Sequence, residues 1–263
     1  MLDLLFIGCH SLPDETGRLH CALRERGMDA GDIRFVSSQD TRTATELIEH
    51  RTAMRGYRVE CLPHFVEDKA RLDALLSEKI EYVAMTTRYF RNVYELYDIV
   101  QYVRSSDPSV KIIIGGGFLR SAASKLEPRE KERLLSLIQA DYYLFYDDCA
   151  RLVRSIVESQ GNARRLEQIP HLVWKEPSGD YHASAACDQS QTALDIPLMW
   201  EESSGLIPEI TSMKTTVSCP FSCSFCAVKN RTEPFRALPL EVIRQNIERL
   251  MRLGRTKILH FTD

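Results

Sequence analysis

The chain has 263 residues, of which 44% are apolar, and its 34 Lys and Arg against 37 Asp and Glu give a formal net charge of −3. This length can bury a sizeable core and suffices for one or two domains. No apolar run approaches the roughly 18 residues of a membrane span, and the slightly acidic balance gives no electrostatic footprint for nucleic acid. We therefore expect neither a membrane nor a nucleic acid as a partner.

The first 160 residues alternate between strand-like and helix-like stretches. Apolar runs bounded by turn signals predict strands at 2–8, 32–36, 57–65 (interrupted by Pro63), 80–87, 111–114 and 141–146. Apolar residues three or four apart predict helices at 45–56, 67–79, 90–105, 130–139 and 150–159. Such alternation with continuous apolar strands predicts an α/β fold with a doubly wound, Rossmann-like parallel sheet.

The carboxyl ends of the predicted strands carry the first candidate site, because ligands of doubly wound sheets bind outside those ends. The residues at these ends are Thr86, Thr87, Gly115, Gly116, Gly117, Tyr146 and Asp147. A flat ligand could approach the glycine backbone closely, since glycine has no Cβ, although a tight turn after a strand explains the same residues. The triple glycine is not a GxGxxG motif, so it does not favour a dinucleotide.

A second candidate site is the run Cys219, Cys223 and Cys226. Three thiolates on a short loop can hold a [4Fe-4S] cluster and leave one iron open to a non-protein ligand. A structural zinc site would need four protein ligands, and His260 is the only histidine after the motif. The other five of the eight cysteines are scattered singly, which fits a reducing cytoplasm and predicts a cytoplasmic protein.

Together with Phe225, the three cysteines resemble the CxxxCxφC signature of radical S-adenosylmethionine (SAM) enzymes. Residues 236–242 and 258–263 resemble the helix entry and second barrel strand of the cobalamin-dependent branch of that family. The chain also resembles the cobalamin-binding domain of the same branch, in residues 82–87, 112–117, 141–149 and 169–175.

This resemblance implies three regions. Residues 1–160 would be a cobalamin-binding domain, 161–210 a connector, and 211–263 the first, incomplete part of a radical SAM (β/α) barrel. Within the connector, residues 177–180 read as a turn between two strand-like pieces, and Trp174 and Trp200 read as packing residues. The barrel needs several more βα units, so we expect roughly 150 or more further residues and poor activity without them.

The implied cofactors are a [4Fe-4S] cluster on the three cysteines, SAM on its open iron, and cobalamin. In that family, strand-end threonines and glycines line the nucleotide tail of cobalamin, and a polar residue such as Asp263 sits where SAM binds. The chain departs from many cobalamin domains because it lacks the DxHxxG motif. His10 follows the first strand without the Asp and Gly of that motif, so we expect cobalamin without a histidine ligand.

The implied reaction is transfer of a methyl group from cobalamin to an unactivated carbon of a small-molecule or peptide substrate, after hydrogen abstraction by a 5′-deoxyadenosyl radical. A flavodoxin or ferredoxin would supply electrons. Rearrangement or cyclisation without methyl transfer, and a non-catalytic cofactor-binding module, remain alternatives. RNA methylthiotransferases share the cluster motif, but Cys9, Cys21 and Cys61 are too isolated to match their three further cluster ligands.

Residues 240–253 form the last predicted helix, ended by Gly254. Its apolar stripe consists of Leu240, Ile243, Ile247, Leu250 and Met251. We expect the whole stripe to face the core of the barrel.

Overall fold

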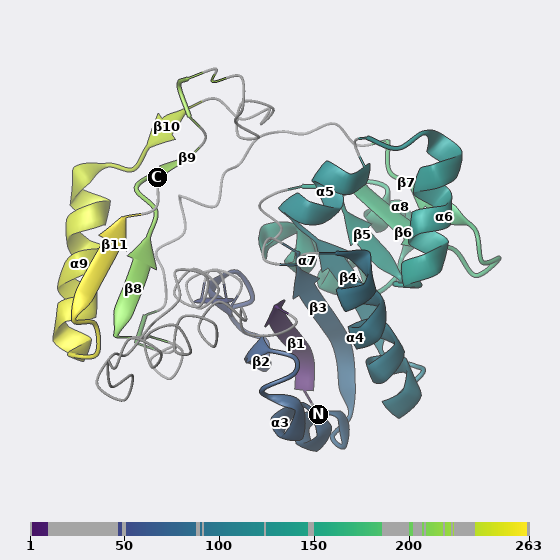
Figure 1. Ribbon diagram of the computed structural model, residues 1–263, viewed down its shortest axis with the longest axis horizontal. Coiled ribbons are helices and arrows are strands. Elements are labelled where there is room, and N and C mark those ends of the chain that lie inside the picture. The colour runs from purple at the N-terminus through teal and green to yellow at the C-terminus, as the bar shows by residue number, and fades with distance from the viewer. Residues whose placement is uncertain are drawn as a thin grey trace, which may run out of the picture.

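The computed structural model (Figure 1) describes most of the chain. The described residues are 2–9, 47–48, 51–87, 90, 92–123, 125–146, 150–185, 200–201, 207, 209–217, 219–221, 223 and 235–261. The strand predicted at 32–36, together with His10, Cys21, Asp147, Cys226 and Asp263, lies outside these residues.

Seven strands form one sheet in the order β2-β1-β3-β4-β5-β6-β7. They are β1 (Leu2–Cys9), β2 (Val59–His64), β3 (Ile80–Thr86), β4 (Lys111–Gly115), β5 (Tyr142–Leu144), β6 (Leu172–Lys175) and β7 (Tyr181–Ala183). The first five strands in this order pair in parallel, whereas β6 and β7 pair antiparallel. The predicted α/β fold with a doubly wound sheet is confirmed.

Helices cover both faces of this sheet (Figure 1). They are α3 (Lys69–Leu76), α4 (Val93–Ser106), α5 (Gly117–Ala123), α6 (Pro128–Ile138), α7 (Ala150–Ser159) and α8 (Ala163–Leu166). Leu72, Leu96, Leu119 and Leu135 pack helices α3 to α6 against one face. Residues of α7 and α8, with Leu47 and Met54, cover the other. Alternate residues of each strand reach opposite faces, so Val83 faces the first layer and Ala84 the second.

Three details of the sheet differ from the sequence expectation. β2 runs through Pro63 without interruption, since β2 is an edge strand and proline is tolerated in edge strands. Helix α5 was not predicted and begins directly at the triple glycine. The predicted turn at 177–180 does connect two strands, but β6 and β7 continue the first sheet past residue 160.

The C-terminal part contains a βαβ unit. β8 (Ile210–Met213) pairs in parallel with β11 (Ile258–Phe261), and α9 (Leu240–Leu253) connects them. Gly254 caps α9 with a positive φ of 65°, as the sequence predicted. Two short strands, β9 (Thr216–Val217) and β10 (Arg236–Ala237), pair antiparallel at the base of the cysteine loop.

The apolar stripe of α9 is only partly in a core, which corrects the sequence expectation. Leu250 is buried, but Leu240 and Met251 are 82% and 74% exposed. Leu250 packs in a small cluster with Ile48, Trp200 and Ile207. Trp174 and Trp200 are both buried, which confirms that they pack. Within the described residues, no helix is long and apolar enough to cross a membrane.

Candidate functional site

The topology of the sheet places the first candidate site. The order β2-β1-β3-β4-β5 is that of flavodoxin-like sheets, in which ligands bind near the switch point between β1 and β3, outside the carboxyl ends of the strands. The chain leaves β1 toward one edge of the sheet and β3 toward the other. Thr86 and Thr87 lie at the end of β3, directly beside this switch point.

The ends of β3 and β4 bring the predicted threonines and glycines together. Thr86 stands opposite Gly115 in the strand register, and the Thr87 N–H donates to the Gly115 carbonyl at 2.7 Å. Both threonines are buried. The Leu119 N–H, in the first turn of α5, donates to the Thr87 hydroxyl at 3.2 Å. Thr87 therefore ties β3 to α5, while its own hydroxyl hydrogen can still be donated.

Gly116 adopts φ 110°, a conformation that side-chain-bearing residues rarely adopt. Its N–H donates to the Leu144 carbonyl at 3.4 Å, and its carbonyl accepts from the Arg120 N–H at 3.1 Å. The glycine is thus required by the turn from β4 into α5. This turn keeps the backbone of Gly115 and Gly116 beside the end of β5, with no Cβ between it and a ligand at that edge.

The end of β5 carries two aromatic residues. Tyr146 is buried and its ring stacks on that of His171, with centroids 5.0 Å apart and planes 12° from parallel. His171 has φ 57°, and its carbonyl accepts from the Phe145 N–H at 3.0 Å. The sequence does not single out His171 within residues 169–175, because nothing in it shows that β6 pairs with β5.

Lys131 of α6 also lies at this edge of the sheet. Its Nζ is 4.0 Å from the centroid of the Phe145 ring, in a cation–π contact. Burial lowers the pKa of the Lys131 ammonium. No sequence motif singles out this lysine among its charged neighbours on α6.

Two of the scattered cysteines belong to the packing of the sheet. Cys9 is buried and its thiol donates to the Pro63 carbonyl at 3.3 Å. Burial raises the pKa of the Cys61 thiol to about 12, so this thiol is neutral at physiological pH. Both thiols are thus buried packing groups of the sheet.

The second candidate site is the loop that follows β8 and β9. Cys219 and Cys223 lie on it as free, exposed thiols, while Cys226 and Asp263 fall outside the described residues. The β9–β10 pairing and a 2.7 Å hydrogen bond from the Leu238 N–H to the Thr215 carbonyl hold the two ends of the loop together. Accessible, unpaired thiols on one short loop fit an iron–sulfur cluster, whose usual ligands are thiolates.

Comparison with solved structures finds folds similar to that of this chain. The cobalamin-dependent S-adenosylmethionine radical enzyme OxsB, with aqua-cobalamin and S-adenosylmethionine bound, superposes with a TM-score of 0.64 at 13% identity. Its apo form gives 0.66 at 12% identity. Each match covers 100% of this chain and 34% of the OxsB chain, so the chain spans about a third of that enzyme. No protein-family model and no curated protein matches.

Proposed function

We propose that this chain binds cobalamin and a [4Fe-4S] cluster as part of a cobalamin-dependent radical SAM enzyme. The observation that carries the proposal is the combination of two sites in one chain. A flavodoxin-like sheet gathers Thr87 and the glycine turn at its ligand edge, and a loop with accessible thiols follows the first strand of a βαβ unit. The fold similarity to OxsB supports the same combination.

The strand-end residues would hold cobalamin. Thr86, Thr87, Gly115, Gly116 and Gly117 line the ends of β3 and β4, where the missing Cβ atoms allow close approach to the backbone. Tyr146 would add a buried aromatic wall, fixed in orientation by its stack on His171. The Thr87 hydroxyl can donate a hydrogen bond to an amide or ribose oxygen without losing its contact with Leu119.

The cysteine loop would hold the cluster. Cys219, Cys223 and Cys226 would each provide a thiolate, which leaves one iron for the amino and carboxylate groups of SAM, and Asp263 would contact SAM at the end of the second barrel strand. When bound, the cluster and cobalamin would supply the electron that cleaves SAM and the methyl group that is transferred. The residues of this chain would orient these groups.

We further propose C-methylation of a small-molecule or peptide substrate as the reaction of the whole enzyme, with a flavodoxin or ferredoxin as electron donor in the cytoplasm. Use of both cofactors favours methyl transfer, since cobalamin can carry a methyl group. Rearrangement without methyl transfer is the alternative reaction, and a product analysis with isotopically labelled SAM would separate the two.

Anaerobic reconstitution tests the cofactor assignment. The chain is incubated with iron, sulfide and hydroxocobalamin, desalted, and analysed by absorption spectroscopy and by iron and cobalt counts. We expect about four irons and about one cobalt per chain. The triple variant Cys219→Ala, Cys223→Ala and Cys226→Ala should lose the iron and keep the cobalt, with the other five cysteines as an internal control for adventitious iron. Iron without cobalt would contradict the cobalamin site, and zinc in place of iron would contradict the cluster.

A further inference from the structure

Lys131 carries a positive charge that the described part of the protein does not neutralise. Among the described residues, no hydrogen bond or ion pair joins its ammonium to a carboxylate, and the contact that the structure gives it is the Phe145 ring. Glu127, one helical turn earlier, is a natural partner by spacing. Its side chain instead accepts from the Glu130 backbone N–H in the capping box of α6, so it is turned toward the helix start.

This arrangement is costly for a structural lysine. Lys131 is half-buried, and a partly desolvated ammonium without an anion is disfavoured relative to an exposed one. The cation–π contact with Phe145 offsets part of that cost but supplies no negative charge. A lysine that served only to cover the helix surface would extend into solvent, as long basic side chains generally do.

The position of Lys131 is next to the candidate ligand edge. Phe145 directly follows β5, and its neighbour Leu144 accepts a hydrogen bond from the Gly116 N–H. The ammonium is therefore separated from the glycine turn by one hydrogen-bonded residue and one aromatic ring. Of the groups that a ligand at this edge can present, an anion is the one that Lys131 would favour.

We propose that Lys131 binds an anionic phosphate group of the ligand held at the ends of β3, β4 and β5. This inference rests on the proposed function: with cobalamin as the ligand, the group is the phosphodiester of the nucleotide tail, which carries one negative charge. The glycine turn would admit the tail, and Lys131 would form an ion pair with its phosphate beside Phe145.

The test compares two corrinoids that differ by the nucleotide tail. Cyanocobalamin has the phosphodiester tail and dicyanocobinamide lacks it, while both are neutral overall. Dissociation constants of each are measured by titration calorimetry on the full 263-residue chain and on Lys131→Met, which keeps the apolar stem and removes the charge. Lys125→Met is the matched control, since Lys125 is exposed just before α6 and its removal changes the net charge equally.

We expect Lys131→Met to weaken cyanocobalamin binding about tenfold or more, as for loss of a charged hydrogen bond, with dicyanocobinamide binding unchanged. Lys131→Arg should retain most of the affinity, and Lys125→Met should bind both corrinoids like the wild type. An equal effect on both corrinoids, or none on either, overturns the inference while the cobalamin site stands. A wild-type chain that binds neither corrinoid overturns the proposed function and this inference together.

If Lys131→Met does not fold, as judged by circular dichroism, the wild type decides the question. An ion pair with the phosphodiester predicts that the preference for cyanocobalamin over dicyanocobinamide shrinks between about 0.05 M and about 0.5 M NaCl. A preference that is independent of salt would overturn the inference.

Discussion

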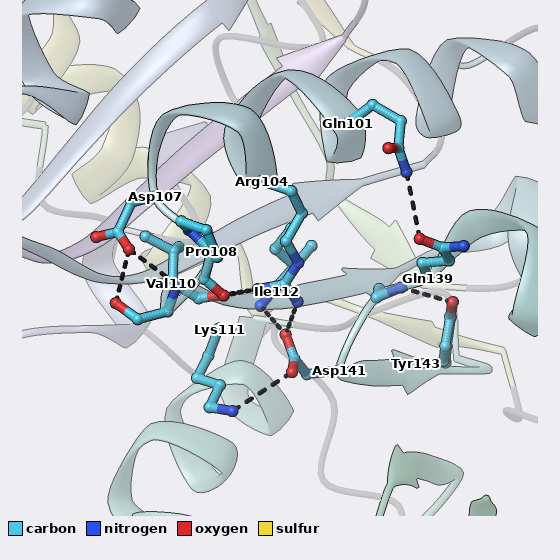
Figure 2. Close-up of polar contacts among 12 residues, drawn as sticks. Gln101, Arg104, Asp107, Pro108, Val110, Lys111, Ile112, Gln139, Asp141 and Tyr143 are labelled. Atoms are coloured by element: carbon cyan, nitrogen blue, oxygen red, sulfur yellow. Dashed lines mark hydrogen bonds and ion pairs between the residues drawn. The ribbon is translucent and has the colours of Figure 1, made fainter. Parts of the chain in front are cut away.

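The amino ends of β4 and β5 are joined by a charged cluster around Asp141, whose removal should measurably destabilise the sheet (Figure 2). The Asp141 carboxylate accepts from the Ile112 N–H at 2.8 Å, from the Lys111 ammonium at 3.5 Å and from the Arg104 guanidinium. Arg104 in addition donates to the Pro108 carbonyl at 3.0 Å. The cluster thereby fixes the end of α4 to two neighbouring strands.

The size of the effect follows from burial. The side chains of Arg104 and Asp141 are 23% and 16% exposed, so this ion pair is intermediate between a surface pair and a buried pair. A surface pair is worth at most about 1 kcal/mol, whereas disruption of a buried pair costs about 3–5 kcal/mol. Asp141→Ala leaves the Ile112 N–H without its acceptor and the Arg104 guanidinium without its carboxylate partner, so we expect a loss of about 2–3 kcal/mol. Asp141→Asn keeps an oxygen for the Ile112 N–H and should lose about 1–2 kcal/mol.

Urea unfolding followed by far-ultraviolet circular dichroism measures these losses. The control is Glu60→Ala, which breaks the exposed Arg71–Glu60 ion pair and should cost less than about 1 kcal/mol. A loss below about 0.5 kcal/mol for Asp141→Ala, or equal losses for Asp141→Ala and Glu60→Ala, would refute the reasoning from burial.

Three further predictions concern the glycine turn, a buried thiol and the contact between Trp200 and α9. Gly116→Ala places a residue with a Cβ at φ 110° and should abolish cobalt retention while iron is kept. The control Gly56→Ala, at φ 96° with open space around it, should lower the free energy of unfolding by about 1–2 kcal/mol, as Gly116→Ala does, and should retain cobalt. Burial raises the Cys61 pKa from 9.0 to about 12, so the Cys61 thiol ionises at lower pH in the unfolded chain than in the folded one. The free energy of unfolding should therefore fall between pH 9 and 12, and Cys61→Val should flatten this dependence in urea titrations. The buried Trp200 indole N–H donates to the Asn246 side-chain oxygen at 3.0 Å, so Asn246→Ala should lower the free energy of unfolding by about 1–3 kcal/mol, measured by thermal unfolding. The double variant with Trp200→Phe should lose less stability than the sum of the two single losses.

The strands of the parallel sheet were predictable because their residues are buried on both faces. The runs at 2–9, 80–86 and 111–115 are apolar except for Asp3, Glu81, Thr86 and Lys111, and such runs have few alternatives to a central strand. Helix α5 was not predicted because it begins at Gly117, the last of three glycines, and is only 7 residues long, too short for an apolar period to be visible. The addition of β6 and β7 to the sheet is a tertiary pairing that no local pattern encodes.

The residues of the candidate site were likewise only partly predictable from the sequence. Thr86, Thr87 and the glycines could be selected from the sequence because the position of a strand end follows from the strand itself. Lys131 and His171 could not, because each reaches the end of β5 from an element whose packing is set by the whole fold. The exposure of Leu240 and Met251 has the same origin, since periodicity shows that a stripe exists but not what covers it.

The short β9–β10 ladder has a consequence for the order of events during maturation. Bringing the ends of a chain segment together carries an entropy cost that grows with its length, and here backbone pairing of Thr216 and Val217 with Ala237 and Arg236 has already met that cost. Under the proposed function, the exposed thiols of Cys219 and Cys223 would therefore lie on a loop whose ends are joined before iron binds. Unlike a small zinc domain, which folds only when metal binds, this segment would then take up the proposed cluster after the polypeptide has folded.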